Sequence, residues 1–262
     1  MAPKPPARSD RPGGAGAPLD GALSAGGPDM APIPAGGAVA HLDVGRPAVG
    51  PSGQPIPLKF DESLRARATS HLDGFTRRTH APGERRPAAV ALVLLPDPEG
   101  RACFLLTRRA ERLRAHARQW ALPGGRIESG ESAEDAARRE LAEEVGLTLG
   151  ADAVLGVLDD YPTRSGFVIT PVVVWCEAAG ELTPNPEEVM RVYHVPLDDL
   201  EGPQVPILIS IPESERPVIQ LPILSTLIHA PTAAVIYQMR EVVVHGRATR
   251  VDHFEQPVWA WK

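Results

Sequence analysis

The chain has 262 residues, of which 43% are hydrophobic, and it carries a formal net charge of -6. This length and composition predict one sizeable domain, and the acidic balance argues against a surface that wraps nucleic acid. The longest apolar run, residues 88–95, is far too short to span a bilayer, so membrane insertion is excluded.

The first 57 residues differ in composition from the rest of the chain. Roughly two-fifths of them are Pro or Gly, many others are Ala, and few are aromatic or β-branched, so they predict a disordered tail. The tail lacks a basic start followed by an apolar stretch, so a secretory signal is not expected and the cytoplasm is the default location. The folded domain is expected at residues 58–262.

The remaining elements are predicted from periodicity and from turn residues. A helix is expected at 61–75, and strands at 88–95, 102–107, 154–159, 167–176, 190–195 and 217–224. A further helix is expected at 231–244 and a short apolar stretch at 257–261, whereas the Pro-rich segment 203–217 receives no assignment. Cys103 and Cys176 lie far apart in predicted strands, which favours buried thiols over a disulfide.

Residues 132–145 predict a helix that carries a cluster of carboxylates. Ser132 followed by Asp135 resembles a capping start, and Gly146 supplies a left-handed stop. The helical spacing puts three glutamates on one face, namely Glu140, Glu143 and Glu144. Such a cluster stays ionised when cations neutralise it, and hard oxygen ligands select Mg²⁺ or Mn²⁺. The alternative is a solvated face with i,i+4 pairs such as Arg139 with Glu143.

The segment 125–147 resembles the Nudix box, G-x5-E-x7-R-E-U-x-E-E-x-G-U, where U is aliphatic. Its fixed positions are filled by Gly125, Glu131, Arg139, Glu140, Glu143, Glu144 and Gly146, with Leu141 and Leu147 at the U positions. The resemblance implies an α/β fold, an α/β/α sandwich with a mixed β-sheet and a loop-helix-loop. It also implies a divalent-metal-dependent hydrolase of nucleoside diphosphate-linked compounds.

The box suggests a role for each polar residue. Glu140 and Glu144 are expected as direct metal ligands, and Glu143 as third ligand or general base. Arg139 with Glu131 is expected to hold the helix in register. A later acid, Glu188, resembles the family's loop acid that completes the metal site, and it is an alternative general base.

The segment 105–125 resembles the coenzyme A pyrophosphatase motif, LLTxR(S/A)x3Rx3Gx3FPGG. Its matching positions include the expected substrate-binding residues Arg109, Arg114, Gly124 and Gly125. Two positions depart from it, because Arg118 replaces a glycine and Leu122 replaces a phenylalanine. The resemblance implies cleavage of coenzyme A or acyl-CoA to 3′,5′-ADP and a 4′-phosphopantetheine product. The segment 161–167, YPTRSGF, is similar to coenzyme A hydrolases and supports the same interpretation.

Two other functions remain open. The first is a Nudix hydrolase that acts on ADP-ribose or a nucleoside triphosphate. The second is a non-catalytic module that binds a nucleotide to regulate a partner, although the retained glutamates argue against it. The expected partner is a small-molecule nucleoside diphosphate compound, with no nucleic acid and no membrane, and a homodimer is compatible with the sequence.

Overall fold

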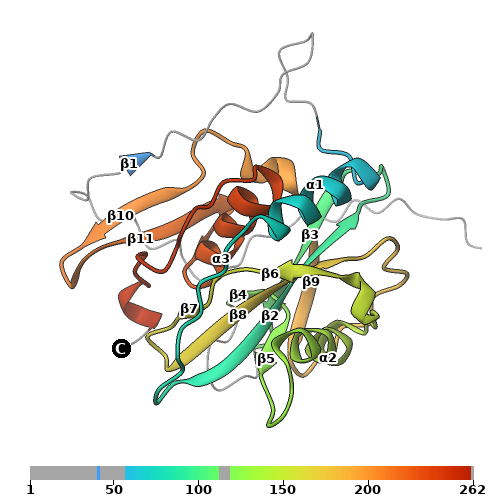
Figure 1. Ribbon diagram of the computed structural model, residues 1–262. Helices are drawn as coiled ribbons and strands as arrows, with labels where there is room; N and C mark the ends of the chain where they lie inside the picture. Colours follow the sequence, from blue (N-terminus) through green and yellow to red (C-terminus); the bar gives the residue numbers. More distant parts are fainter. Residues whose placement is uncertain (1–39, 42–56, 112–118, 261–262) are drawn as a thin grey trace, which may run out of the picture. The chain divides into compact units, whose positions relative to one another are not determined.

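The computed structural model describes residues 40–41, 57–111 and 119–260 (Figure 1). These residues all belong to one compact unit, Pro34–Lys262. Apart from the short strand β1 (Ala40–His41), the predicted tail lies outside the described residues and its disorder stays a prediction. Arg114 and Arg118 also lie outside them.

The central layer is a mixed sheet of eight strands. Its middle strand, β2 (Arg86–Pro96), pairs in parallel with β8 (Phe167–Trp175) and antiparallel with β3 (Ala102–Arg109) and β5 (Gly124–Arg126). The other strands are β4 (Trp120–Ala121), β6 (Val154–Val157), β7 (Tyr161–Pro162) and β9 (Val189–Pro196). The predicted mixed sheet is therefore confirmed.

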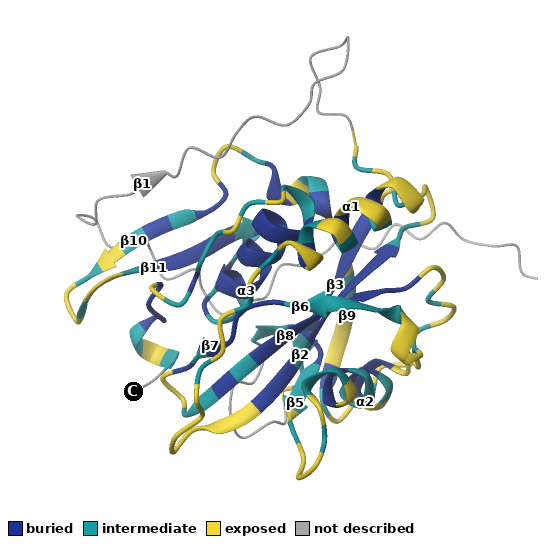
Figure 2. Ribbon diagram, viewed as in Figure 1, coloured by how far each residue is buried: buried dark blue, intermediate teal, exposed yellow. Residues whose placement is uncertain are grey.

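Helices cover both faces of this sheet. On one face, α2 (Ala133–Val145) packs its apolar side on alternate residues of β2, such as Ala91 and Val93. On the other face, Leu92 and Leu94 lie in a second cluster with residues of α1 (Glu62–Asp73) and α3 (Thr232–Met239). The strands between these helices and α3 itself are mostly buried (Figure 2). The predicted α/β/α sandwich is confirmed.

The helix ends follow the local sequence signals. The Asp61 carboxylate accepts a hydrogen bond from the Leu64 amide at 2.9 Å, which caps α1. The Ser132 hydroxyl accepts one from the Asp135 amide at 3.0 Å, which caps α2. Gly146 ends α2 with a φ of 73°, the left-handed conformation that its sequence position predicted.

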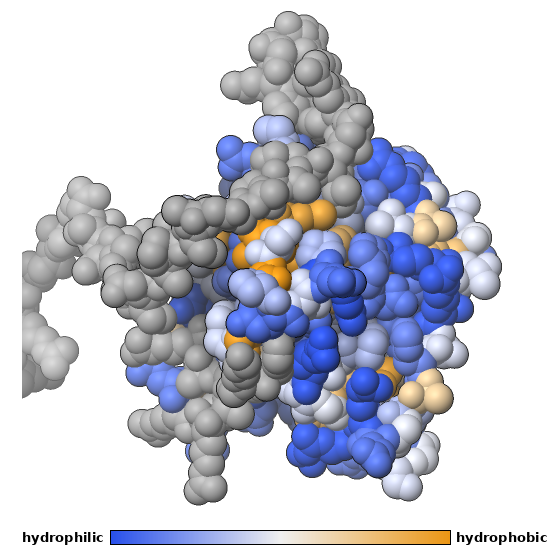
Figure 3. All heavy atoms as spheres, turned by 90° about the vertical axis from the view of Figure 1, so that its left-hand side faces the viewer, coloured by the Kyte–Doolittle hydropathy of each residue, from blue (hydrophilic) through white to orange (hydrophobic). Residues whose placement is uncertain are grey.

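A second sheet has four strands in the order β1-β10-β11-β12, of which β1 precedes the central sheet in the chain and the other three follow it. It contains β10 (Ile207–Ile211), β11 (Ser214–Ile223) and β12 (Thr226–His229). Residues 203–217 received no assignment from the sequence, because Pro206, Pro212 and Pro217 interrupt an alternating pattern. In the structure Pro206 precedes β10, Pro212 lies in the turn between β10 and β11, and Pro217 lies within β11. The face seen in Figure 3 is mostly hydrophilic, with one hydrophobic patch near its centre.

The predicted C-terminal helix changes geometry along its length, because α3 continues as a π-helical turn at Arg240–Val244. Short 3₁₀ turns lie at Ala151–Ala153, Leu197–Leu200 and Val258–Ala260. Cys103 and Cys176 are buried free thiols, as expected. No helix in the described part of the chain is long and apolar enough to cross a membrane.

Glu255 connects the C-terminal segment to residues earlier in the chain through hydrogen bonds. Its carboxylate, only 1% exposed, accepts hydrogen bonds from the Arg164 guanidinium and from the Ser214 hydroxyl. The hydrogen bonds from Arg164 hold the pKa of Glu255 at about 2, well below its ordinary value. Because the folded pKa is depressed, this stabilisation is complete above about pH 5 and is lost as the pH falls toward 2.

We therefore expect Glu255→Gln to lower the free energy of unfolding at pH 7 by about 1 to 2 kcal/mol, since Arg164 stays partly solvated. The difference from the wild type should shrink at pH 3. Urea unfolding at pH 7 and pH 3 measures the free energy of unfolding of both proteins. If the two proteins differ by the same amount at both pH values, the charge of the Glu255 carboxylate contributes nothing to stability.

Candidate active site

Two glycines bring the backbone of β5 close to the acidic helix. Gly125 pairs with Ala89 of β2, and the following loop leads into α2. A Cβ atom at Gly125 would lie 2.1 Å from Oε1 of Glu140, so a larger residue would displace that carboxylate. The requirement for glycine at the start of the motif is therefore steric, because the backbone contacts the first glutamate of the cluster.

Arg139 is bonded to three carboxylates. Its Nε donates to Oε1 of Glu131 at 2.9 Å, and its Nη1 donates to Oε1 of Glu140 at 2.9 Å and to Oε2 of Glu143 at 3.1 Å. Its Nη2 also donates to the Arg126 carbonyl at 3.0 Å. These bonds raise the pKa of Arg139, and the bond from Arg139 lowers the pKa of Glu131. The expected pairing of Arg139 with Glu131 is present, and it connects the loop to the helix.

Glu144 is the most deeply buried acid of the box, with 3% of its surface exposed. Its Oε2 accepts a hydrogen bond from the Gly124 amide at 3.3 Å. Burial raises the pKa of Glu144 to about 8; the positive charge of Arg109 opposes this shift, and the negative charges of Glu140 and Glu188 add to it. At neutral pH this carboxyl therefore holds a proton unless further positive charge arrives.

Glu188 lies in the turn before β9 and close enough to Glu140 and Glu144 for its charge to raise the pKa of both. For Glu140, burial is the main cause of the raised pKa, and the hydrogen bond that Arg139 donates to it lowers the pKa. The Glu188 carbonyl accepts a hydrogen bond from the Ala110 amide at 2.8 Å, which keeps this turn beside Arg109. The structure thus brings a loop acid, the box acids and Arg109 together. Glu143 is more exposed, at 57% of its side chain.

The donor set suits a hard divalent cation. Within the described ranges, no group of three or more His, Cys, Asp and Glu side chains is arranged to hold a metal ion. The carboxylates are bonded to Arg139 and to the Gly124 amide instead. All candidate ligands are carboxylate oxygens, and the burial of Glu144 and Glu140 disfavours their charged forms. A cation that compensates this cost, with oxygen ligands only, fits the site.

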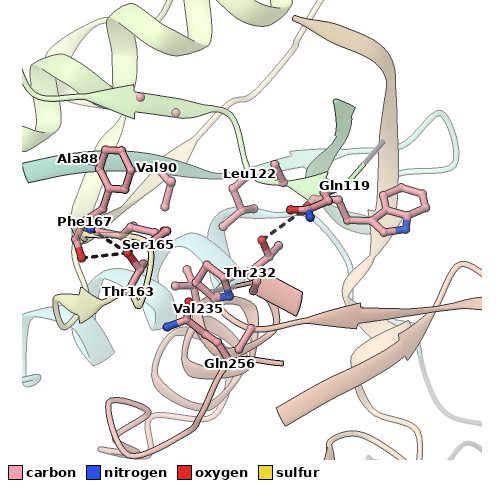
Figure 4. Close-up of a pocket in the computed structure, with 18 of the residues that line it drawn as sticks. Ala88, Val90, Gln119, Leu122, Thr163, Ser165, Phe167, Thr232, Val235 and Gln256 are labelled. Atoms are coloured by element: carbon pink, nitrogen blue, oxygen red, sulfur yellow. Dashed lines mark hydrogen bonds between the residues drawn. The ribbon is translucent and has the colours of Figure 1, made fainter. Parts of the chain in front are cut away.

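A pocket of about 300 Å³ adjoins the two glycines. Val90 of β2, Phe167 of β8 and Leu122, which lies between β4 and β5, line one side of it, and Thr232, Val235 and Gln256 line it from the C-terminal part of the chain (Figure 4). Gly124, Gly125 and Arg109 line it as well. A ligand in this pocket would therefore lie next to the acidic helix.

The structure places the expected substrate-binding residues as follows. Arg109, Gly124 and Gly125 border the pocket, whereas Arg114 falls outside the described residues. Leu122, which departs from the coenzyme A motif, is buried and lines the pocket. Thr163, Ser165 and Phe167 of the YPTRSGF segment line it too. The sequence predicted a helix at 231–244 and an apolar stretch at 257–261, but it did not place either of them at the pocket.

The α/β/α sandwich and the loop-helix-loop with its acidic cluster are the features that the resemblance to the Nudix box implies. Residues 85–214 match the family model of the NUDIX domain. Residues 85–214 are therefore similar to the NUDIX domain family, and this range contains the box.

The relatives found by comparison carry the same family name. The "uncharacterized Nudix hydrolase NudL" of Pectobacterium atrosepticum is 39% identical over 117 residues, 44% of this chain and 60% of that protein. The protein of the same name from Yersinia pestis is 38% identical over 115 residues, 44% of this chain and 57% of that protein. The chain thus spans about three-fifths of the length of the curated relatives it matches.

Among solved structures, a Nudix hydrolase from M. smegmatis, RenU, is similar to this chain with a TM-score of 0.42 and 25% identity, covering 61% of this chain and 86% of that one.

Proposed function

We propose that this protein is a pyrophosphohydrolase that uses Mg²⁺ or Mn²⁺ to cleave a nucleoside diphosphate-linked compound. The observation that carries the proposal is the position of Glu144 and Glu140. Both are carboxylates with raised pKa values, and they lie against Gly124 and Gly125 at the edge of a pocket. The pocket can hold the organic part of a substrate while its diphosphate reaches the acidic helix.

A linear diphosphate resists hydrolysis because its anionic oxygens repel a nucleophile. Glu140 and Glu144 would hold a divalent cation, which would neutralise that charge and lower the pKa of water at the diphosphate. For hydrolysis, a water oxygen would bond to one phosphorus, the bridging P–O bond to the leaving phosphate would break, and a general base would take the proton of the water. Glu143 and Glu188 are the two candidates for this base: the charge of each raises the pKa of Glu140, and the charge of Glu188 also raises the pKa of Glu144. Arg139 and Glu131 hold α2 in register with the loop.

For the substrate, we propose coenzyme A or an acyl derivative, cleaved to 3′,5′-ADP and a 4′-phosphopantetheine product. The motif at 105–125 and the position of Arg109 between the pocket and Glu144 support this proposal. Arg109 offers the charge-assisted donors that a phosphate-rich ligand requires. We also propose a cytoplasmic location, which the reducing state expected for the two free thiols favours.

Product analysis tests the substrate directly. Coenzyme A, dephospho-coenzyme A, ADP-ribose, NADH and nucleoside triphosphates are incubated at equal concentration with Mg²⁺ or Mn²⁺, and the products are identified by mass spectrometry. We expect coenzyme A to give the highest kcat/KM, with products split at the diphosphate. If ADP-ribose or a triphosphate is cleaved at least about tenfold more efficiently, the coenzyme A assignment is wrong and the hydrolase assignment stands. If nothing is cleaved, the hydrolase assignment is wrong.

A further inference from the structure

The pocket beside the active site has two walls from different parts of the chain. The inner wall comes from the Nudix domain, through β2, β8 and the segment around Leu122. The outer wall comes from residues 230–260, which lie beyond the matched family range of 85–214. Val235 of α3, Gln256 and Trp259 belong to this outer wall (Figure 4 labels the first two). A segment outside the family domain thus shapes the space that the substrate would enter.

Direct contacts join the outer wall to the inner one. The Thr232 hydroxyl donates to the Trp120 carbonyl at 3.2 Å. The Tyr161 hydroxyl donates to the Phe254 carbonyl at 3.0 Å, and Gln256 Oε1 accepts from the Arg164 amide at 3.3 Å. The outer wall is therefore fixed in place before a ligand arrives, and such preorganisation favours selectivity.

The chemistry of the lining favours a flat, uncharged ring linked to a phosphate. Phe167 and Trp259 supply aromatic surface, and Val90, Leu122 and Val235 supply aliphatic surface. Among the described residues that line the pocket, only Arg109 and Arg126 are charged, and both charges are positive. Arg126 belongs to β5 with Gly124 and Gly125, so positive charge lies at the end nearest the acidic helix. A ligand with its phosphate at that end and a ring beyond it matches this polarity.

Trp259 has an unusual degree of exposure. With 53% of its surface accessible, it is one of only two exposed large hydrophobic residues among those the structure describes. Its ring meets His229 of β12 edge-on at 5.5 Å between centroids, so β12 supports it at the pocket. A ring stacked on Trp259 would remove apolar surface from water, and aromatic side chains stack on all nucleobases.

We propose that residues 230–260 form a specificity wall that holds the base of the substrate nucleotide, with Trp259 stacking on the base and Val235 limiting its size. This inference rests on the proposed function, since it assigns the organic half of the same substrate to the pocket. The pantetheine arm of coenzyme A would then lie outside it.

Binding of fragments tests the assignment without turnover. Isothermal titration calorimetry measures the affinity of the full chain for AMP, for ribose 5-phosphate and for 4′-phosphopantetheine. In the wild type, AMP should bind more tightly than ribose 5-phosphate, which carries the same phosphate without the base. Trp259→Ala should weaken AMP binding by roughly 5- to 100-fold, the range expected for one lost stacking contact, and leave ribose 5-phosphate unchanged.

Two further variants complete the test. Val235→Phe fills the pocket and should also weaken AMP binding, whereas Val235→Ala should not. Val258→Ala changes a neighbour of Trp259 in the same turn that does not line the pocket, so it should bind AMP like the wild type. Thermal melts show which variants are folded, and Trp259→Ala, altered at an exposed site, remains informative if Val235→Phe does not fold.

The inference is overturned if AMP binds no better than ribose 5-phosphate, if Trp259→Ala binds AMP like the wild type, or if the variants weaken 4′-phosphopantetheine binding instead. Failure of the proposed function has a different signature. In that case AMP binding still depends on Trp259, but the substrate panel shows no hydrolysis.

Discussion

Glu144→Gln should lower kcat by about a hundredfold or more, which corresponds to about 2.7 kcal/mol of transition-state stabilisation. The change keeps the shape of the side chain and removes the charge that a metal ligand in this position requires. The neutral amide can still lie beside the Gly124 amide, so α2 and β5 should keep their packing. Steady-state hydrolysis with Mg²⁺ or Mn²⁺ measures the effect.

The same variant has an expected stability signature without metal. The folded pKa of Glu144, about 8, is above the ordinary value of 4.5, so burial of this group disfavours the folded state increasingly as the pH rises from about 4.5 to 8. Glutamine does not titrate, so metal-free Glu144→Gln should melt at an equal or higher temperature than the wild type at pH 8.

Glu134→Gln in the first turn of α2 is the matched control, because it removes one charge from the same helix away from the site. It should keep kcat within about threefold of the wild type. Turnover of Glu144→Gln within that same range would remove Glu144 from the metal site.

Arg139→Ala should lower kcat by about 10- to 100-fold, the usual range for loss of a group that orients metal ligands. Arg139 donates to Glu131, Glu140 and Glu143, and its loss leaves these carboxylates with mutual repulsion and no fixed orientation. The neighbouring residue provides the control, since Arg138 donates to Asp135 and to the Leu149 carbonyl on the same helix.

Arg138→Ala should therefore cost stability of at most about 1 kcal/mol and leave kcat nearly unchanged. Measurement of kcat shows whether each variant disturbs the orientation of the carboxylates. Thermal melts show whether it destabilises the helix. Equal losses of kcat in the two variants would contradict the orienting role of Arg139.

The acidic helix was predictable because its signals are local. Ser132 and Gly146 fix its ends, and the spacing of the glutamates fixes which residues share a face. The pairing of Arg139 with Glu131 spans only eight positions and follows from the motif. The central strands were also predictable, since buried apolar runs such as β2 indicate strands directly.

The C-terminal half of the pocket was not predictable from the sequence, because it depends on contacts between distant residues. The Thr232 hydroxyl meets the Trp120 carbonyl, 112 positions away, and no local pattern indicates this. The four-stranded sheet was not predicted as a whole, because prolines usually indicate loops. Here they flank paired strands and also lie within strands such as β11. Propensity describes local backbone preference, whereas these elements form through tertiary packing.

We propose that the carboxylates of α2 bind a divalent cation. Calorimetric titration of Mn²⁺ into metal-free protein at pH 7, in two buffers of different ionisation enthalpy, measures both binding and proton release. Glu144, with a pKa of about 8, must lose its proton to bind a metal. We predict saturable binding with release of nearly one proton in the wild type, and loss of both in Glu144→Gln. Identical binding and proton release in the two proteins would contradict the assignment.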